Sequence, residues 1–176
     1  MKATGIVRRI DDLGRVVIPK EIRRTMRIRE GDPLEIYTGA GGEVIFKKYS
    51  PMGELAADAE IFAESLASQS KLAVIICDRD RCIAASGVSK KEVLEKRNSA
   101  DLEEIINMRQ SRTFNENEQK LALENCSLNI AVASPIISAG DITGAVVFLS
   151  VDGNWATESD FKLACSAAQF LGNRIQ

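Results

Sequence analysis

The chain has 176 residues, 45% hydrophobic and 27% charged, which are ordinary values for a globular protein. It contains no apolar run long enough to span a membrane and no signal peptide, so we expect a cytoplasmic protein with no membrane partner. Histidine is absent. Its absence removes the commonest general base and metal ligand and any Ser-His or Cys-His pair, so we expect no enzyme, metal or cofactor.

The sign of the charge divides the chain into two parts. Residues 1–50 carry 11 basic and 7 acidic side chains, a net charge of +4, whereas residues 51–176 carry a net charge of −6. The sign changes near residues 50–53, where turn-forming residues interrupt the pattern. We therefore predict one domain over 1–50, a linker or flanking helix over 51–70, and a second domain over 71–176.

The first block begins with two short β-branched segments. Residues 6–11 and 15–18 are predicted strands, and the turn formers at 11–14 join them into a hairpin. Pro19 fits the first position of a helix, because its missing N–H needs no partner there. Over residues 19–26, apolar side chains at four-residue spacing share one helix face, and basic side chains share the opposite face.

Positive charge is concentrated in this hairpin and helix. Residues 1–29 carry nine basic and three acidic side chains, a net charge of +6 in a chain whose total is −2. Such a patch is typical of a polyanion-binding protein, because each neutralised phosphate releases condensed counterions. A solvated surface also carries charge, but here basic residues recur on both the hairpin and the adjacent helix. We therefore predict duplex DNA as a partner.

The first block is small for a domain that folds alone. A second predicted hairpin, with strands at 34–38 and 43–49, completes it. About 50 residues bury too little surface to be comfortably stable by themselves. We therefore expect this block to fold as a homodimer.

The run D-D-L-G-R-V-V-I-P-K-E-I-R, at residues 11–23, is a specific motif. With its surroundings it resembles the AbrB-type swapped-hairpin DNA-binding domains of bacterial transition-state regulators. The resemblance implies an intertwined β-barrel dimer that reads DNA shape at pseudo-symmetric sites. It also implies DNA contacts from basic residues of the hairpin and helix. These are Arg8, Arg9, Arg15, Arg23 and Arg24, with Lys2 and Lys20 as phosphate contacts.

Arg8 and Arg9 are adjacent, which restricts how both can reach DNA. Neighbouring side chains of a regular strand point to opposite faces. Both therefore face DNA only if a strand edge or a bulge presents them, and otherwise one of them serves an ion pair.

The second domain has the pattern of an α+β fold, an antiparallel sheet with helices on its faces. Apolar residues from Met52 to Leu66 recur at spacings of three and four, which fits either a short coiled-coil seam or packing on the domain core. Thr157 is a predicted N-cap of the last helix, with Asp160 three residues on. The predicted strands are 72–77, 81–86, 128–137 and 142–151, and the predicted helices are 90–97, 101–108 and 157–175.

Residues 134–153, S-P-I-I-S-A-G-D-I-T-G-A-V-V-F-L-S-V-D-G, and the helix after them resemble the C-terminal half of GAF domains. GAF domains sense small molecules or mediate dimerisation, so the resemblance implies either role, with an effector of unknown identity. No glycine-rich phosphate loop follows a strand, so nothing indicates a nucleotide. Two self-contacting surfaces on one chain would give a homotetramer.

Together the two domains resemble two-domain sporulation regulators of endospore-forming Bacillus relatives, which implies both activation and repression of transcription. The first alternative is an autorepressing antitoxin, because the swapped-hairpin fold also serves toxin–antitoxin operons. In antitoxins a flexible tail usually follows that fold in the chain, whereas 51–176 has the pattern of a folded domain.

The second alternative is a thiol-dependent GAF reductase, for which Cys77, Cys82 and Cys126 would have to converge with one lowered pKa. All four cysteines lie beside apolar residues, which favours buried small side chains.

Overall fold

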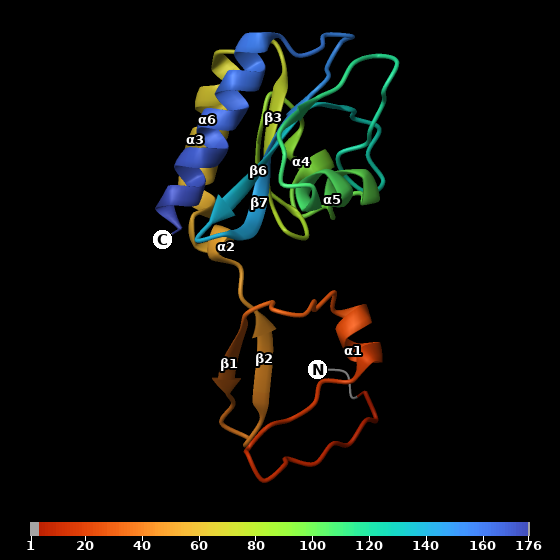
Figure 1. Cartoon of the computed structure of the whole chain (residues 1–176), viewed down its shortest axis with the longest axis vertical. Coiled ribbons are helices and arrows are strands. Elements are labelled where there is room, and N and C mark those ends of the chain that lie inside the picture. Colours follow the sequence, from red (N-terminus) through yellow and green to blue (C-terminus); the bar gives the residue numbers. More distant parts are fainter. Residues whose placement is uncertain (1–3, 176) are drawn as a thin grey trace. The chain divides into compact units, whose positions relative to one another are not determined.

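The computed structural model describes residues 4–175, which form two compact units that divide between Tyr49 and Ser50. The first unit contains helix α1 (Lys20–Thr25) and strands β1 (Leu34–Thr38) and β2 (Val44–Lys48) (Figure 1). The two strands pair antiparallel over their whole length. Both this hairpin and the short helix before it are confirmed within a few residues.

The predicted strands at 6–11 and 15–18 are wrong for the single chain. The turn between them forms, because the N–H of Asp11 donates to the carbonyl of Arg15 at 3.1 Å. The segments on either side of that turn are not strands. A strand needs a hydrogen-bonded neighbour, and the described part of one chain supplies none here. The first unit therefore forms no closed barrel by itself.

The second unit is a five-stranded antiparallel sheet in the order β4-β3-β7-β6-β5, with helices on both faces. Helices α2, α3 and α6 cover one face, and α4 and α5 cover the other (Figure 1). The predicted α+β class is confirmed. The strands are β3 (Ala73–Asp78), β4 (Cys82–Ser86), β5 (Arg112–Thr113), β6 (Ile130–Ser138) and β7 (Asp141–Leu149). The helices are α2 (Pro51–Glu54), α3 (Ala56–Ser68), α4 (Lys90–Val93), α5 (Ala100–Asn107) and α6 (Glu158–Arg174).

Helix α6 begins where its sequence predicts. The Thr157 hydroxyl accepts a hydrogen bond from the N–H of Asp160, and the Asp160 carboxylate accepts from the N–H of Thr157. Such a capping box satisfies two N–H groups that a helix start otherwise leaves unpaired. The apolar residues between Met52 and Leu66 pack mainly on the sheet, because Met52, Ala59 and Leu66 belong to its core.

The predicted helix at 90–97 is only half correct. Helix α4 ends at Val93, and the next residues bond to the β4 strand instead. The N–H of Glu95 donates to the carbonyl of Cys82, and the N–H of Cys82 donates to the carbonyl of Lys96, both at 2.9 Å. Tertiary hydrogen bonds replace the helical ones at this point.

No helix within residues 4–175 is both long and apolar enough to cross a membrane.

Candidate nucleic-acid interface

Helix α1 brings three of the predicted DNA-binding residues together. Lys20, Arg23 and Arg24 lie on this six-residue helix and are exposed. Pro19 precedes the helix as its N-cap rather than as its first residue, which corrects the predicted position by one. The helix therefore displays a cluster of cationic side chains to solvent.

Arg8 and Arg9 lie on the extended segment before the first turn and are also exposed. Because this segment is not a strand in the single chain, strand geometry does not set the directions of their side chains. None of the side chains of Arg8, Arg9, Lys20, Arg23 and Arg24 has a hydrogen-bond or ion-pair partner among residues 4–175. Lys2, the remaining predicted phosphate contact, lies outside the described residues.

Arg15 differs from these residues, because its side chain forms an ion pair with Asp11. One Asp11 carboxylate oxygen accepts from the N–H groups of Leu13 at 3.0 Å and Arg15 at 2.8 Å. The other oxygen accepts from Arg15 Nε at 2.8 Å. Gly14 takes the positive φ, +76°, that lets the chain turn within this loop.

The Arg15 guanidinium stays mostly in solvent, with 69% of its side chain exposed. The backbone N–H of Arg15, followed by its guanidinium, lowers the pKa of Asp11 below its ordinary value. Asp11 is a positioning residue that the sequence analysis missed. An aspartate opening a turn four residues before an arginine is the signal that could have identified it.

Other basic residues of the first unit hold the fold. Helix α1 ends in a Schellman motif, in which Arg27 has a φ of +51° and the N–H of Ile28 donates to the carbonyl of Arg23 at 2.8 Å. Lys48 Nζ donates to the carbonyl of Arg27 at 3.0 Å and pairs with Asp32 at 3.2 Å. Lys48 thus uses its charge within the fold, whereas Arg8, Arg9, Lys20, Arg23, Arg24 and Lys47 have no acidic partner among residues 4–175.

Three of the cysteines contact one apolar core on the α4–α5 side of the sheet, where Cys126 is only partly buried. Cys77 and Cys82 lie opposite each other on β3 and β4. Burial above all, with the neighbouring Cys82 thiol, raises the pKa of Cys77 well above its ordinary range. A reactive thiol needs the opposite shift, so the surroundings of Cys77 are those of a packing side chain.

Residues 4–175 contain no group of three or more cysteine, aspartate or glutamate side chains placed to hold a metal ion.

Comparisons with known proteins agree with this division into two units. A family described as "Stage V sporulation protein T C-terminal, transcription factor" matches residues 54–176, and one described as "Antidote-toxin recognition MazE, bacterial antitoxin" matches residues 7–53. Stage V sporulation protein T of Bacillus subtilis (strain 168) is 49% identical over 179 aligned positions, which cover 100% of this chain and 99% of that protein.

Two further relatives correspond to one unit each. Transition state regulatory protein AbrB of Bacillus subtilis (strain 168) is 61% identical over 51 residues, which are 29% of this chain and 52% of that protein. The solved GAF domain of the Acinetobacter phosphoenolpyruvate-protein phosphotransferase superposes with a TM-score of 0.56 at 14% identity. That match covers 73% of this chain and 84% of the other, and it shows that the second unit has the GAF fold.

An AbrB-like basic block followed by a GAF-type domain defines a regulator of transcription. The matches extend over the whole length of the chain and include a relative that is nearly half identical. The chain belongs to the stage V sporulation protein T family of transcription factors. The family predicted from the sequence is thereby confirmed.

Proposed function

We propose that this protein regulates sporulation genes in the cytoplasm, activating some and repressing others, by binding duplex DNA through its first unit. In this proposal Arg8, Arg9, Arg23 and Arg24 contact DNA, and Lys20 and Lys2 contact phosphates. Arg15 contacts DNA in the orientation that Asp11 imposes. The protein acts by binding and not by catalysis.

One observation carries the DNA-binding proposal. Six cationic side chains of residues 4–49, which are the five predicted contacts Arg8, Arg9, Lys20, Arg23 and Arg24 together with Lys47, have no partner among the described residues, although acidic side chains are available in the same unit. Surface cations of a folded protein are often paired, but cations that neutralise phosphates must be available to DNA. Binding through such groups releases counterions, so affinity falls steeply as salt rises.

The first unit has the exposed apolar surface expected of half a dimer. Within residues 4–49 only Pro19 is buried as a whole residue. Val7 is 88% exposed, Val17 72%, Leu13 69% and Ile10 68%. A monomer with so much apolar surface and no core would be marginal. We infer that the segments flanking the first turn pair with a second copy of the chain, as in swapped-hairpin dimers.

The second unit has the size and core to assemble these dimers and to receive a small-molecule effector. It is a folded domain with an apolar core on each face of its sheet. That core argues against the antitoxin alternative, in which a flexible tail would follow the DNA-binding fold. The raised pKa of Cys77 argues against the reductase alternative.

Salt-dependent DNA binding tests the proposal. The full chain is titrated against fluorescent duplex DNA at several salt concentrations, alongside Arg23→Ala and Arg24→Ala. Each substitution is expected to weaken binding and to reduce the slope of log affinity against log salt by about one for each lost phosphate contact.

Arg174→Ala is the matched control, because Arg174 is an exposed arginine of α6 that pairs with Asp58. It removes the same charge from the other unit and is expected to leave the slope unchanged. Equal affinity of the wild type, Arg23→Ala and Arg24→Ala would exclude the α1 surface as the contact.

A further inference from the structure

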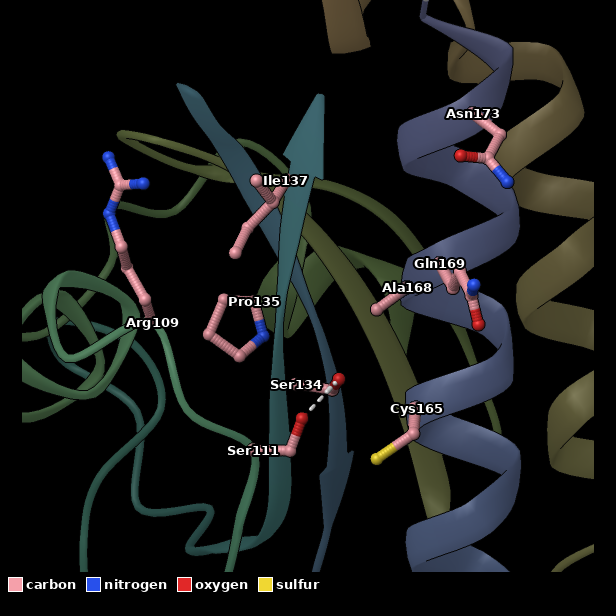
Figure 2. A pocket seen from close by; sticks show the side chains of 9 residues that line it. All are labelled: Arg109, Ser111, Ser134, Pro135, Ile137, Cys165, Ala168, Gln169 and Asn173. Carbon is pink, nitrogen blue, oxygen red and sulfur yellow. Dashed lines mark hydrogen bonds between the residues drawn. The ribbon is translucent and has the colours of Figure 1, made fainter. Parts of the chain in front are cut away.

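Polar side chains gather at two places outside the predicted DNA contacts. One is a hollow of about 250 Å³ on the second unit, between α6, β6 and the loop from α5 to β5 (Figure 2). Its Ser111 and Ser134 hydroxyls bond to each other, whereas the Arg109 guanidinium points away from them and donates to the carbonyl of Gly140. Because these groups do not converge, the hollow lacks the arrangement of a ligand site. The other place, at the end of α1, brings its polar groups together on one carboxylate.

Lys48, the last residue of β2, forms an ion pair with Asp32 beyond the C-terminal end of α1. Its Nζ lies 3.2 Å from an Asp32 carboxylate oxygen and donates to the carbonyl of Arg27 at 3.0 Å. The same carboxylate oxygen accepts from the N–H of Arg29 at 2.8 Å. The Asp32 side chain is 1% exposed and that of Lys48 21%, so the pair is largely withdrawn from solvent. A cation is favourable at this point, because the last carbonyls of a helix carry partial negative charge.

This cluster ties α1 to the β1–β2 hairpin. In the hairpin, Lys48 lies opposite Leu34, so the strand pairing fixes its position. The carbonyl that Lys48 holds belongs to Arg27, which follows the C-cap of α1. The next N–H, that of Ile28, donates to the carbonyl of Arg23. No residue of α1 is buried, so apolar packing within one chain contributes little to the orientation of the helix.

Lys47, the neighbour of Lys48, has the opposite surroundings. Successive side chains of a strand point to opposite faces. Lys47 is exposed, and its side chain has no partner among residues 4–175. Glu35 lies opposite it in the hairpin, but the Glu35 carboxylate accepts from the Tyr37 hydroxyl instead. Two adjacent lysines of equal charge therefore differ in whether the fold uses them.

We propose that Lys48 is a positioning residue for DNA recognition. With Asp32 it fixes the end of α1 on the hairpin and so sets where Arg23 and Arg24 present their charges. Lys48 does not itself contact DNA, because Asp32 and the Arg27 carbonyl already take up its charge, whereas a phosphate contact needs an available cation. This inference rests on the DNA-binding role proposed above.

A double-mutant cycle on the full chain tests this role, with affinity for a fluorescent duplex as the readout. Lys48→Met removes the cation from the cluster, and Lys47→Met removes the same charge from the exposed neighbour. Lys48→Met is expected to weaken binding about tenfold, as for one lost charge-assisted hydrogen bond. Combined with Arg24→Ala, the loss should be at least about fivefold smaller than the product of the two separate losses, because residues that act through one element are coupled. The losses from Lys47→Met and Arg24→Ala should multiply within about twofold.

A second variant guards against a loss of folding. Lys48→Met leaves the buried Asp32 carboxylate without its cation, which destabilises the first unit. A chain carrying both Asp32→Asn and Lys48→Met has no such lone charge and is expected to show the same coupling with Arg24→Ala. Near-UV circular dichroism of tyrosine shows whether the first unit stays folded, because both tyrosines, Tyr37 and Tyr49, lie in it.

The cycle separates positioning from stability and from DNA binding itself. An ion pair that only stabilised the fold would shift the unfolding temperature and leave the losses multiplicative. Multiplicative losses in a folded Lys48→Met or doubly substituted chain, like those of Lys47→Met, would therefore overturn the positioning role. A wild-type chain with no salt-dependent affinity for DNA would instead overturn the DNA-binding proposal.

Discussion

In the proposed interface, Asp11 is an acidic residue whose contacts would favour binding to a polyanion. Its carboxylate accepts hydrogen bonds from the backbone N–H groups of Leu13 and Arg15 and from the Arg15 side chain. By charge alone, Asp11→Ala would strengthen DNA binding, because it removes a negative group from a basic surface. Because Asp11 orients Arg15, we expect the opposite, a loss of about threefold to thirtyfold in affinity, as for one or two lost hydrogen bonds.

Asp12→Ala is the control for this substitution. Asp12 is exposed and adjacent to Asp11, and its side chain has no hydrogen-bond or ion-pair partner among residues 4–175, so its removal changes the charge without disturbing the loop. Fluorescence anisotropy at fixed salt is expected to give equal or tighter binding for Asp12→Ala. If both substitutions tightened binding alike, Asp11 would act through its charge and not through Arg15.

At the scale of elements, the cap of α6 links the helix to a distant part of the chain. The Asp160 carboxylate accepts from the Ser70 hydroxyl at 2.5 Å, besides the N–H and hydroxyl of Thr157. Burial opposes the ionisation of Asp160, but these hydrogen bonds outweigh it and lower its pKa below the ordinary 3.8. A carboxyl group whose pKa is lower in the folded state than in the unfolded state stabilises the fold at pH values above its ordinary pKa. That stabilisation is lost as the pH falls through the folded-state pKa.

Asp160→Asn is therefore expected to lower the free energy of unfolding by about 1–2 kcal/mol at neutral pH. The difference from the wild type should shrink as the pH falls below the ordinary carboxyl range, where the wild-type group also becomes protonated. Urea unfolding between neutral and acidic pH measures this difference. Glu158→Gln, in the same helical turn but exposed, should show little change at any pH. If the difference in the free energy of unfolding between Asp160→Asn and the wild type stayed constant with pH, the ionised Asp160 carboxylate would not be the stabilising group.

Elements that depend on local signals could be predicted from the sequence. Thr157 and Asp160 form their capping box within one helical turn, so the start of α6 is visible in the sequence alone. The helix at 90–97 was overpredicted, because Glu95 bonds to Cys82, a contact that no local pattern specifies. The hollow beside α6 was also beyond prediction, since it depends on β5 ending after two residues.

The basic interface was predictable in composition but not in detail. Charge density and the motif at 11–23 indicated the block and its candidate residues, whereas the pairing of Arg15 with Asp11 required coordinates. The strands at 6–11 and 15–18 have the right sequence for strands, yet one chain gives them no partner. A sequence can specify a strand whose neighbour belongs to another molecule.

For the whole molecule, two separate exposed apolar surfaces support the proposed self-association. The first is the exposed apolar surface of residues 4–49, which includes Val17 at 72% exposure. The second lies on α3 and α6, where Phe62 stacks on Phe170 with ring centroids 5.1 Å apart and Ile61 is 66% exposed. If both surfaces form two-fold contacts, the simplest closed assembly is a tetramer, which we propose for this chain.

Single substitutions should separate these two contacts. An aspartate buried in an apolar interface costs several kcal/mol, enough to dissociate it. We expect Val17→Asp and Ile61→Asp each to convert a tetramer into a dimer, and the double substitution to give a monomer. Sedimentation velocity measures the mass, and thermal unfolding tests whether the second unit of each variant remains folded. Met108→Asp, at an exposed apolar position elsewhere, should remain tetrameric.

The two dimers should differ in function, because they retain different interfaces. Ile61→Asp keeps the paired first units, so its affinity for a single DNA site should fall little and its salt dependence should persist. Val17→Asp keeps only the contact through α3 and α6, so its basic residues are no longer held in one two-fold surface and its DNA affinity should fall sharply. A Val17→Asp chain that became a dimer yet bound DNA normally would show that the first unit folds and recognises DNA without a partner. The exposed apolar surface of residues 4–49 would then need another explanation.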